Sequence, residues 1–180
     1  MATAPIIPAP PQDIEEIQLL DNSLVFPAFT AQTAWALGCL LRTKLQALDK
    51  PAIVDISLVH GNHCLFHCAT QSGTSPDNDS WVERKRNTVL RWGTSTWYMS
   101  RKFMGDYKTF AEKTGLGIDA ARYAIHGGGW PVRVRGVEGV VAVVVVSGLK
   151  QDQDHAIIVQ TVGEMLEELS EDTGEKRKED

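Results

Sequence analysis

Seven consecutive apolar residues, Val140–Val146, constrain the fold of this chain more than any other feature. An unbroken apolar run of this length is typical of a central strand that is buried on both of its faces. The run is far too short to cross a bilayer, which takes about 20 apolar residues in a helix. We therefore expect a sheet in which this strand is central and covered on both sides.

Two hairpins are predicted to supply the strands of that sheet. Ala52–Val59 alternates apolar and polar residues, and a turn at His60–Asn62 leads to a return strand over His63–Ala69. Val132–Arg135 alternates in the same way and turns at Gly136–Gly139 into the apolar run. Alternation with a period of two residues indicates a strand with one buried face. Both strand pairs are therefore expected to be antiparallel.

Segments of helical periodicity surround these hairpins. The expected helices cover residues 12–21, 31–48, 80–92, 95–104 and 152–169. Thr30 can cap the second helix, and Ser80 with Glu83 forms the capping-box pattern that would open the third. Gln71–Asp79 is expected to be a loop, and residues 105–118 are expected to be irregular. The order helix, hairpin, helices, hairpin, helix predicts an α+β fold rather than a doubly wound parallel sheet.

The length and composition predict one domain. The 180 residues carry a net charge of −5, which argues against a nucleic-acid binder because phosphate neutralisation needs a basic face. The domain is expected over residues 12–170, after a proline-rich disordered lead-in over 1–11 and before a charged flexible tail over 171–180. The sequence has no signal-peptide pattern, no run long enough for a membrane anchor and an odd number of cysteines, three. These features predict a cytoplasmic protein with free thiols.

Lys85 is the least expected residue in the predicted helix over 80–92, because it lies in the middle of an apolar stripe. The stripe consists of Trp81, Val82, Val89 and Trp92. A charge in such a place must extend to solvent, pair with an opposite charge or bind a ligand. Asp77 or Asp79 could supply the pair. The alternative is an anion site in which Arg84 and Lys85 meet a carboxylate or a phosphate.

Two histidines are further candidates for a site. His155 falls in the first turn of the last helix, where the helix dipole disfavours imidazolium, so a neutral ring is expected. It can then accept a hydrogen bond or ligate, or it can be a hydrogen-bonded histidine of the core. His126 leads the glycine loop Gly127–Gly129, which can bring the backbone close to a ligand or make a tight bend. No metal site is predicted, because the histidine spacing fits no zinc pattern and Asp77–Asp79 lacks the glycine and glutamate of a calcium loop.

Five strings carry a family resemblance when they are taken in order. They are Val54–Ser57, Gly61–Phe66, Asp77–Lys85, Tyr123–Gly128 and Val146–His155. Together they resemble the heme-degrading-domain-like family, also called the HbpS/GlcG-like family, and within it the branch formerly called uncharacterised protein family 0303. The likeness covers about residues 12–170. It implies a profilin-like fold, with a central antiparallel sheet and helices on both sides, and a homo-oligomer.

The same resemblance implies where a ligand would bind. The residues expected to bind it are Asp77, Asp79, Trp81, Arg84, Lys85, His126, Gly127, Gly128 and His155. No settled set of catalytic residues is implied. The third glycine of the loop and the proline-rich N-terminus depart from the family pattern, and a longer loop would change the pocket beside Lys85.

Three functions remain open from the sequence. The first is binding of heme or another anionic planar ligand, because some relatives bind heme and the family name reflects a heme-degrading activity. The second is a non-catalytic oligomeric adaptor, because fungal members of the branch are linked to the delivery of tail-anchored membrane proteins. The third is an enzyme in which the glycine loop stabilises an oxyanion or a phosphate. A non-catalytic role is favoured because no nucleophile–base pair is evident.

Overall fold

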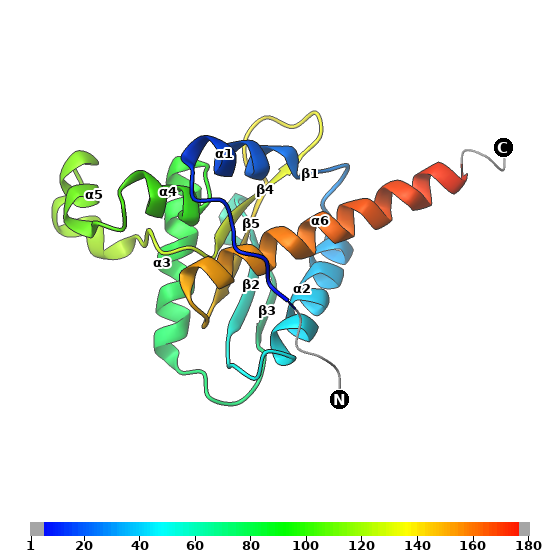
Figure 1. The fold of residues 1–180 in the computed structure, drawn as a ribbon, viewed down its shortest axis with the longest axis horizontal. Helices are drawn as coiled ribbons and strands as arrows, with labels where there is room; N and C mark the ends of the chain where they lie inside the picture. Colours follow the sequence, from blue (N-terminus) through cyan, green and yellow to red (C-terminus); the bar gives the residue numbers. More distant parts are fainter. Residues whose placement is uncertain (1–5, 177–180) are drawn as a thin grey trace.

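The computed structural model describes residues 6–176, and their side chains as far as Glu171. Five strands form one mixed sheet in the order β1-β4-β5-β2-β3 (Figure 1). They are β1 (Val25–Phe26), β2 (Ile53–Leu58), β3 (Cys64–Ala69), β4 (Gly129–Val134) and β5 (Ala142–Ser147). Every neighbouring pair is antiparallel except β1 and β4, which are parallel. The apolar run is therefore central, between β4 and β2, as predicted.

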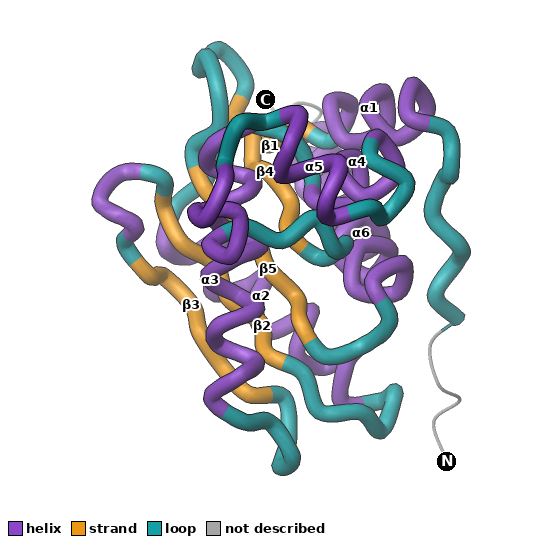
Figure 2. Tube along the Cα trace, turned by 90° about the vertical axis from the view of Figure 1, so that its left-hand side faces the viewer, coloured by secondary structure: helices purple, strands orange, loops and turns teal. Residues whose placement is uncertain are grey.

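Six α-helices surround the sheet (Figures 1 and 2). They are α1 (Ile14–Ser23), α2 (Ala31–Gln46), α3 (Pro76–Trp92), α4 (Thr96–Lys102), α5 (Tyr107–Lys113) and α6 (Gln151–Lys176). On β5, Val144 and Val146 belong to the main core beneath α2 and α6, whereas Val143 and Val145 pack against α3. Both faces of the sheet are therefore covered, which confirms the predicted α+β fold.

α3 begins earlier than the sequence analysis predicts. Ser75 is its N-cap and Pro76 its first residue, and the Asn78 side-chain oxygen accepts a hydrogen bond of 2.8 Å from the Ser75 backbone N–H. Proline suits the first helical position because its fixed φ is helical and its missing N–H has no partner there. The predicted capping box at Ser80 is wrong, because Ser80 lies inside the helix. The loop that was expected to end at Asp79 ends at Ser75.

Three further elements were not predicted. The segment 105–118, expected to be irregular, contains α5 and the start of a 3-10 helix over Gly117–Arg122. Asp106 caps α5 by accepting hydrogen bonds from the backbone N–H groups of Lys108 and Thr109. β1 is only two residues long, too short to show an alternating pattern.

The N-terminal end of the described chain contacts the domain, and the C-terminal end continues α6. Residues 6–11 of the predicted lead-in have no helix or strand, but the Trp97 indole N–H donates to the Pro11 carbonyl at 2.8 Å. α6 runs on to Lys176, so residues 171–176 of the predicted tail are helical. Residues 1–5 and 177–180, which complete the predicted lead-in and tail, lie outside the described residues.

Candidate functional site

A small cavity opens where the first turns of α3 and α6 meet the glycine loop before β4 and the turn after β5. Its volume is about 260 Å³. It is lined by Asp77, Asn78, Trp81, Lys85, His126, Ser147, Gly148, Leu149, Gln151 and Asp154. Four residues predicted to bind a ligand therefore line one cavity, namely Asp77, Trp81, Lys85 and His126.

A buried ion pair lies in the wall of this cavity. The Lys85 ammonium donates to the Asp154 carboxylate and to the Val146 carbonyl, both at 2.9 Å, and each charged side chain is 3% exposed. Asp154 also accepts hydrogen bonds from the backbone N–H groups of Gly148 and Leu149. Burial raises the pKa of Asp154, and Lys85 and these N–H groups act in the opposite direction. The pair joins α3, α6 and the end of β5 at one point.

The partner of Lys85 was predicted wrongly. Asp79 instead lies 3.1 Å from Nε2 of His67, and Asp77 lines the cavity without an ion pair to Lys85 in the described residues. The sequence shows an acidic residue in the first turn of the last helix, which was the available signal for Asp154. Lys85 and Asp154 are 69 positions apart in the sequence, so no local pattern could predict their contact.

The glycine loop is required for this packing. At Gly128, φ is +113°, and an added Cβ would lie 2.3 Å from the Val146 carbonyl oxygen and 2.7 Å from the Lys85 nitrogen. At Gly127, a Cβ would lie 2.3 Å from the carbonyl oxygen of Gln151. The glycines thus allow the loop to approach the ion pair and α6 closely.

Trp81 and His126 form the aromatic part of the cavity lining. Their rings meet edge to face with centroids 5.0 Å apart. Burial, followed by the charges of Lys85 and Arg84, lowers the pKa of His126. The imidazole is therefore neutral at pH 7, with one ring nitrogen able to accept a hydrogen bond or coordinate a metal ion.

Arg84 does not join Lys85 in a shared anion site. Its guanidinium lies over the Trp81 ring, 4.5 Å from the centroid, and donates to the Tyr107 hydroxyl and the Tyr123 carbonyl. Consecutive residues of a helix point about 100° apart, so Lys85 enters the interior while Arg84 stays at the side.

His155 lies outside the cavity, in the core. It has no exposed surface, and burial lowers its pKa to about 3, so the ring is neutral as predicted. Burial, rather than the helix dipole, is the main cause. Within the described residues, neither ring nitrogen has a hydrogen-bond partner, and the Asp21 carboxylate lies 3.9 Å from Nε2. The expected core histidine is therefore present without the expected hydrogen bond.

Two pairs that residue types alone could pose as catalytic, Asp55 with His60 and Ser147 with His155, are not formed. Asp55 contacts His67 at 2.9 Å, with Ser57 and Arg86 as its other partners, rather than His60. Within the described residues, no hydrogen bond joins Ser147 to His155. No group of three His, Cys, Asp or Glu side chains among the described residues is placed to hold a metal ion.

Comparison with known proteins identifies relatives of the whole domain. The model of the family described as "Haem degrading protein HbpS-like" matches residues 29–163. A protein of Streptomyces avermitilis named "UPF0303 protein" is 40% identical over 158 residues, which is 88% of this chain and 93% of that protein. "UPF0303 protein YBR137W" of Saccharomyces cerevisiae is 38% identical over 161 residues, 86% of this chain and 87% of that protein.

Solved structures share the fold. "Crystal structure of Ybr137w protein" superposes with a TM-score of 0.80 at 36% identity, covering 87% of this chain and 88% of that one. "Crystal Structure of PduOC:Heme Complex" superposes with a TM-score of 0.61 at 17% identity, covering 76% and 94%. None of the helices within residues 6–176 has the length and apolar character that crossing a membrane would require.

Proposed function

The chain belongs to the family of haem degrading HbpS-like proteins, and on that premise we propose that it binds heme or another anionic planar ligand at the Trp81–His126 cavity. The single observation that carries this proposal is a neutral imidazole at the mouth of a cavity, edge to face with an indole ring. Imidazole is a frequent axial ligand of heme iron, and an indole ring offers a flat apolar surface to a planar ligand.

Arg84 is the charge near the mouth that could attract an anion, and it acts against the Asp77 carboxylate, which also lines the cavity. Lys85 and Arg84 both lower the pKa of His126, which means that both place positive potential at that ring. Lys85 is neutralised by Asp154, but Arg84 forms no ion pair with a carboxylate among the described residues. A carboxylate of a bound ligand would therefore be attracted mainly by Arg84.

The size of the cavity limits how a heme can sit. A volume of about 260 Å³ lies below the roughly 300–1,000 Å³ of pockets that enclose drug-sized ligands. A cavity of this size does not enclose a heme, and His126 and Trp81 would be the residues that hold one at its mouth. When bound, heme would supply an iron centre for ligand or redox chemistry. The protein residues would hold and orient it.

A heme titration followed by absorbance tests this proposal. We expect a saturable one-to-one site with a sharp ligated spectrum, because adsorption to apolar surface would not saturate at one equivalent. His126→Ala should abolish the ligated spectrum. His63→Ala, an exposed histidine of the first hairpin, is the matched control and should bind as the unmodified protein does. Equal spectra for both variants would show that the site is elsewhere.

A second candidate function, the oligomeric adaptor, is favoured by a different surface. Trp35 on α2 is 64% exposed and packs edge to face against Phe66 of β3, whose outer edge pairs with no strand among the described residues. β3 carries no Lys, Pro, Asp or Glu, the residues that usually protect such an edge. We propose that a second copy pairs with β3 in a homo-oligomer. The same proposal includes the binding of protein partners that deliver tail-anchored membrane proteins.

Sedimentation tests the oligomer. We expect an oligomer at micromolar concentration that Trp35→Glu dissociates, whereas Val137→Glu, another exposed apolar position, leaves it intact. A monomer, or an oligomer indifferent to Trp35→Glu, would contradict the proposed interface.

A further inference from the structure

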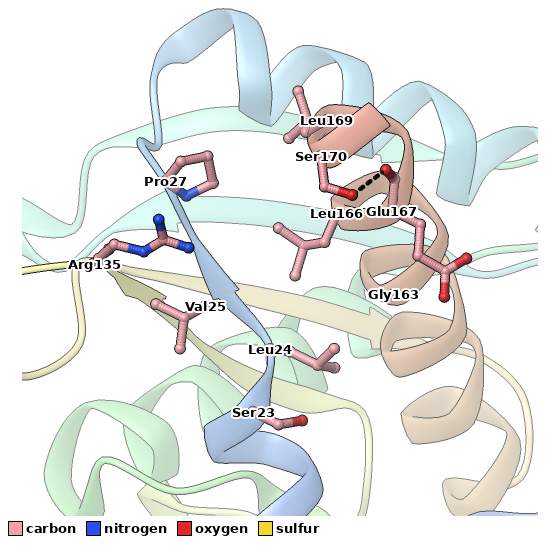
Figure 3. Close-up of a pocket in the computed structure, with 10 residues that line it drawn as sticks. All are labelled: Ser23, Leu24, Val25, Pro27, Arg135, Gly163, Leu166, Glu167, Leu169 and Ser170. Atoms are coloured by element: carbon pink, nitrogen blue, oxygen red, sulfur yellow. Dashed lines mark hydrogen bonds between the residues drawn. The ribbon is translucent and has the colours of Figure 1, made fainter. Parts of the chain in front are cut away.

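A second and larger hollow lies between the open edge of β1 and the second half of α6. Its volume is about 620 Å³, within the range of pockets that enclose small molecules. Figure 3 shows the Leu24 side chain between β1 and α6, on the side where Leu166 and Leu169 lie, and the Val25 side chain on the other side of β1. We call this hollow the β1–α6 groove. All four side chains are only partly buried, so apolar surface remains for a ligand to cover.

Gly163 keeps the groove open. It lies inside α6, where glycine is less favourable than alanine because it gains no side chain and loses more backbone entropy. An added Cβ at this position would meet no atom within 4 Å. Helix packing therefore does not require the glycine. Its effect is to leave empty a volume that a side chain would fill.

Arg135 supplies a positive charge at one end of the groove. Its backbone N–H donates to the Phe26 carbonyl at 2.9 Å, which fixes the start of the side chain beside β1. Among residues 6–171, no carboxylate forms an ion pair with Arg135, although Glu167 also lines the groove. In Figure 3, the Arg135 guanidinium and the Glu167 carboxylate lie on opposite sides of the residues drawn.

From these features we propose that the β1–α6 groove binds a single-chain amphipathic carboxylate of the medium-chain fatty acid class. The hydrocarbon chain would lie against the side chains of Leu24, Leu166 and Leu169, and its carboxylate would meet the Arg135 guanidinium. The combination of apolar walls with an arginine that pairs with no carboxylate among residues 6–171 fits this class, because each part of the ligand meets its complement.

The groove is distinct from the Trp81–His126 cavity. Its lining holds none of the His, Cys, Met or Tyr side chains that ligate heme iron. The inference therefore does not depend on the proposed heme site, and each can fail without the other.

Calorimetric titration with decanoate, below its micelle concentration, tests the inference on the full chain. We expect one site per chain, which decyltrimethylammonium, with the same tail and opposite charge, does not occupy. Affinity should rise by up to about fourfold for each methylene added from octanoate to decanoate, the gain expected for a buried CH₂. Equal binding of the cationic compound, or no binding of decanoate, would overturn the proposal.

Variants separate the groove from general adsorption. Arg135→Ala should weaken decanoate roughly five- to tenfold and Arg135→Lys less, whereas Arg122→Ala, an exposed arginine outside the groove, should have no effect. Gly163→Leu should block binding without lowering the unfolding temperature, because leucine favours the helix and fills empty volume. His126→Ala should bind decanoate normally. Binding that survives both Arg135→Ala and Gly163→Leu would refute the assignment to this groove.

Discussion

Replacing His155 with leucine should stabilise the protein at mildly acidic pH. The ring is fully buried, and within the described residues its nitrogens lack hydrogen-bond partners. The folded protein therefore resists protonation of this ring, whereas the unfolded chain accepts a proton near the ordinary pKa of 6.5. Leucine has a similar volume and no titrating group.

The size of the effect follows from the pKa shift. The pKa of His155 is about 3 in the folded protein and 6.5 in the unfolded chain. Above pH 6.5 the ring is neutral in both states, and as pH falls from 6.5 toward 3 the unfolded chain gains a proton that the folded protein does not, so the free energy of unfolding decreases. The full loss would be roughly 5 kcal/mol, and the loss between pH 7.5 and pH 5 about 2 kcal/mol. The His155→Leu variant should lack this part of the loss.

Urea denaturation at pH 7.5, 6 and 5, at one protein concentration, measures the difference. The free energy of unfolding of the variant should gain about 2 kcal/mol on the unmodified protein over this range. Comparing the two proteins removes titrating groups that are distant from His155, and repeating the comparison in an Asp21→Asn background removes Asp21, which lies 3.9 Å from the ring. His63→Leu, at an exposed position, should leave the pH dependence unchanged. If the free energies of unfolding of His155→Leu and of the unmodified protein changed in parallel with pH, the prediction of a buried neutral ring would be wrong.

Lys85→Met should cost about 3–5 kcal/mol of unfolding free energy, because it leaves the Asp154 carboxylate buried without its cation. Adding Asp154→Asn should cost less than the sum of the two single changes, and strict additivity in urea denaturation would contradict the ion pair. Asp21→Asn should abolish a gain of about 2 kcal/mol as pH falls from 7 to 4, because burial raises the pKa of Asp21 from 3.8 to about 6 and the folded state then binds the proton more tightly. An identical pH dependence for both proteins in urea denaturation would exclude that shift. Gly128→Ala should cost about 3 kcal/mol or more from positive φ and the clash with the Val146 carbonyl, and an unchanged thermal unfolding midpoint would show that the loop can move away.

The strands of the fold could be predicted because their residues repeat locally. The apolar run of β5 and the alternation in β2 identify these segments as strands without any knowledge of the partner strand, but the alternation wrongly predicts one exposed face for β2, whose Asp55 and Ser57 are also buried. The start of α3 could also have been read from Pro76, but the capping pattern at Ser80 competed with it. β1 is defined by its two-residue pairing with β4, which no local pattern reveals.

The candidate site could be predicted only in part, because most of its contacts join distant segments. Lys85 stands out within its own helix, but whether it meets Asp154, Asp79 or a ligand depends on how α3 and α6 cross the sheet. His155 could be expected in the core, but the lack of hydrogen-bond partners for its ring among the described residues depends on distant segments. Arg84 looks equivalent to Lys85 in the sequence and differs only through the direction of its side chain.

α6 is one continuous helix that lines both the Trp81–His126 cavity and the β1–α6 groove. Asp154 near its start closes the wall of the Trp81–His126 cavity, and Leu166 near its middle forms the wall of the β1–α6 groove. These positions are about 18 Å apart along the helix axis at 1.5 Å per residue. A continuous helix transmits a shift along its axis almost undiminished, while the buried Lys85–Asp154 pair resists any shift at the cavity end. A displacement of the groove wall would therefore require α6 to bend beyond that anchor, and Gly163 is the residue between Asp154 and Leu166 with the greatest backbone freedom.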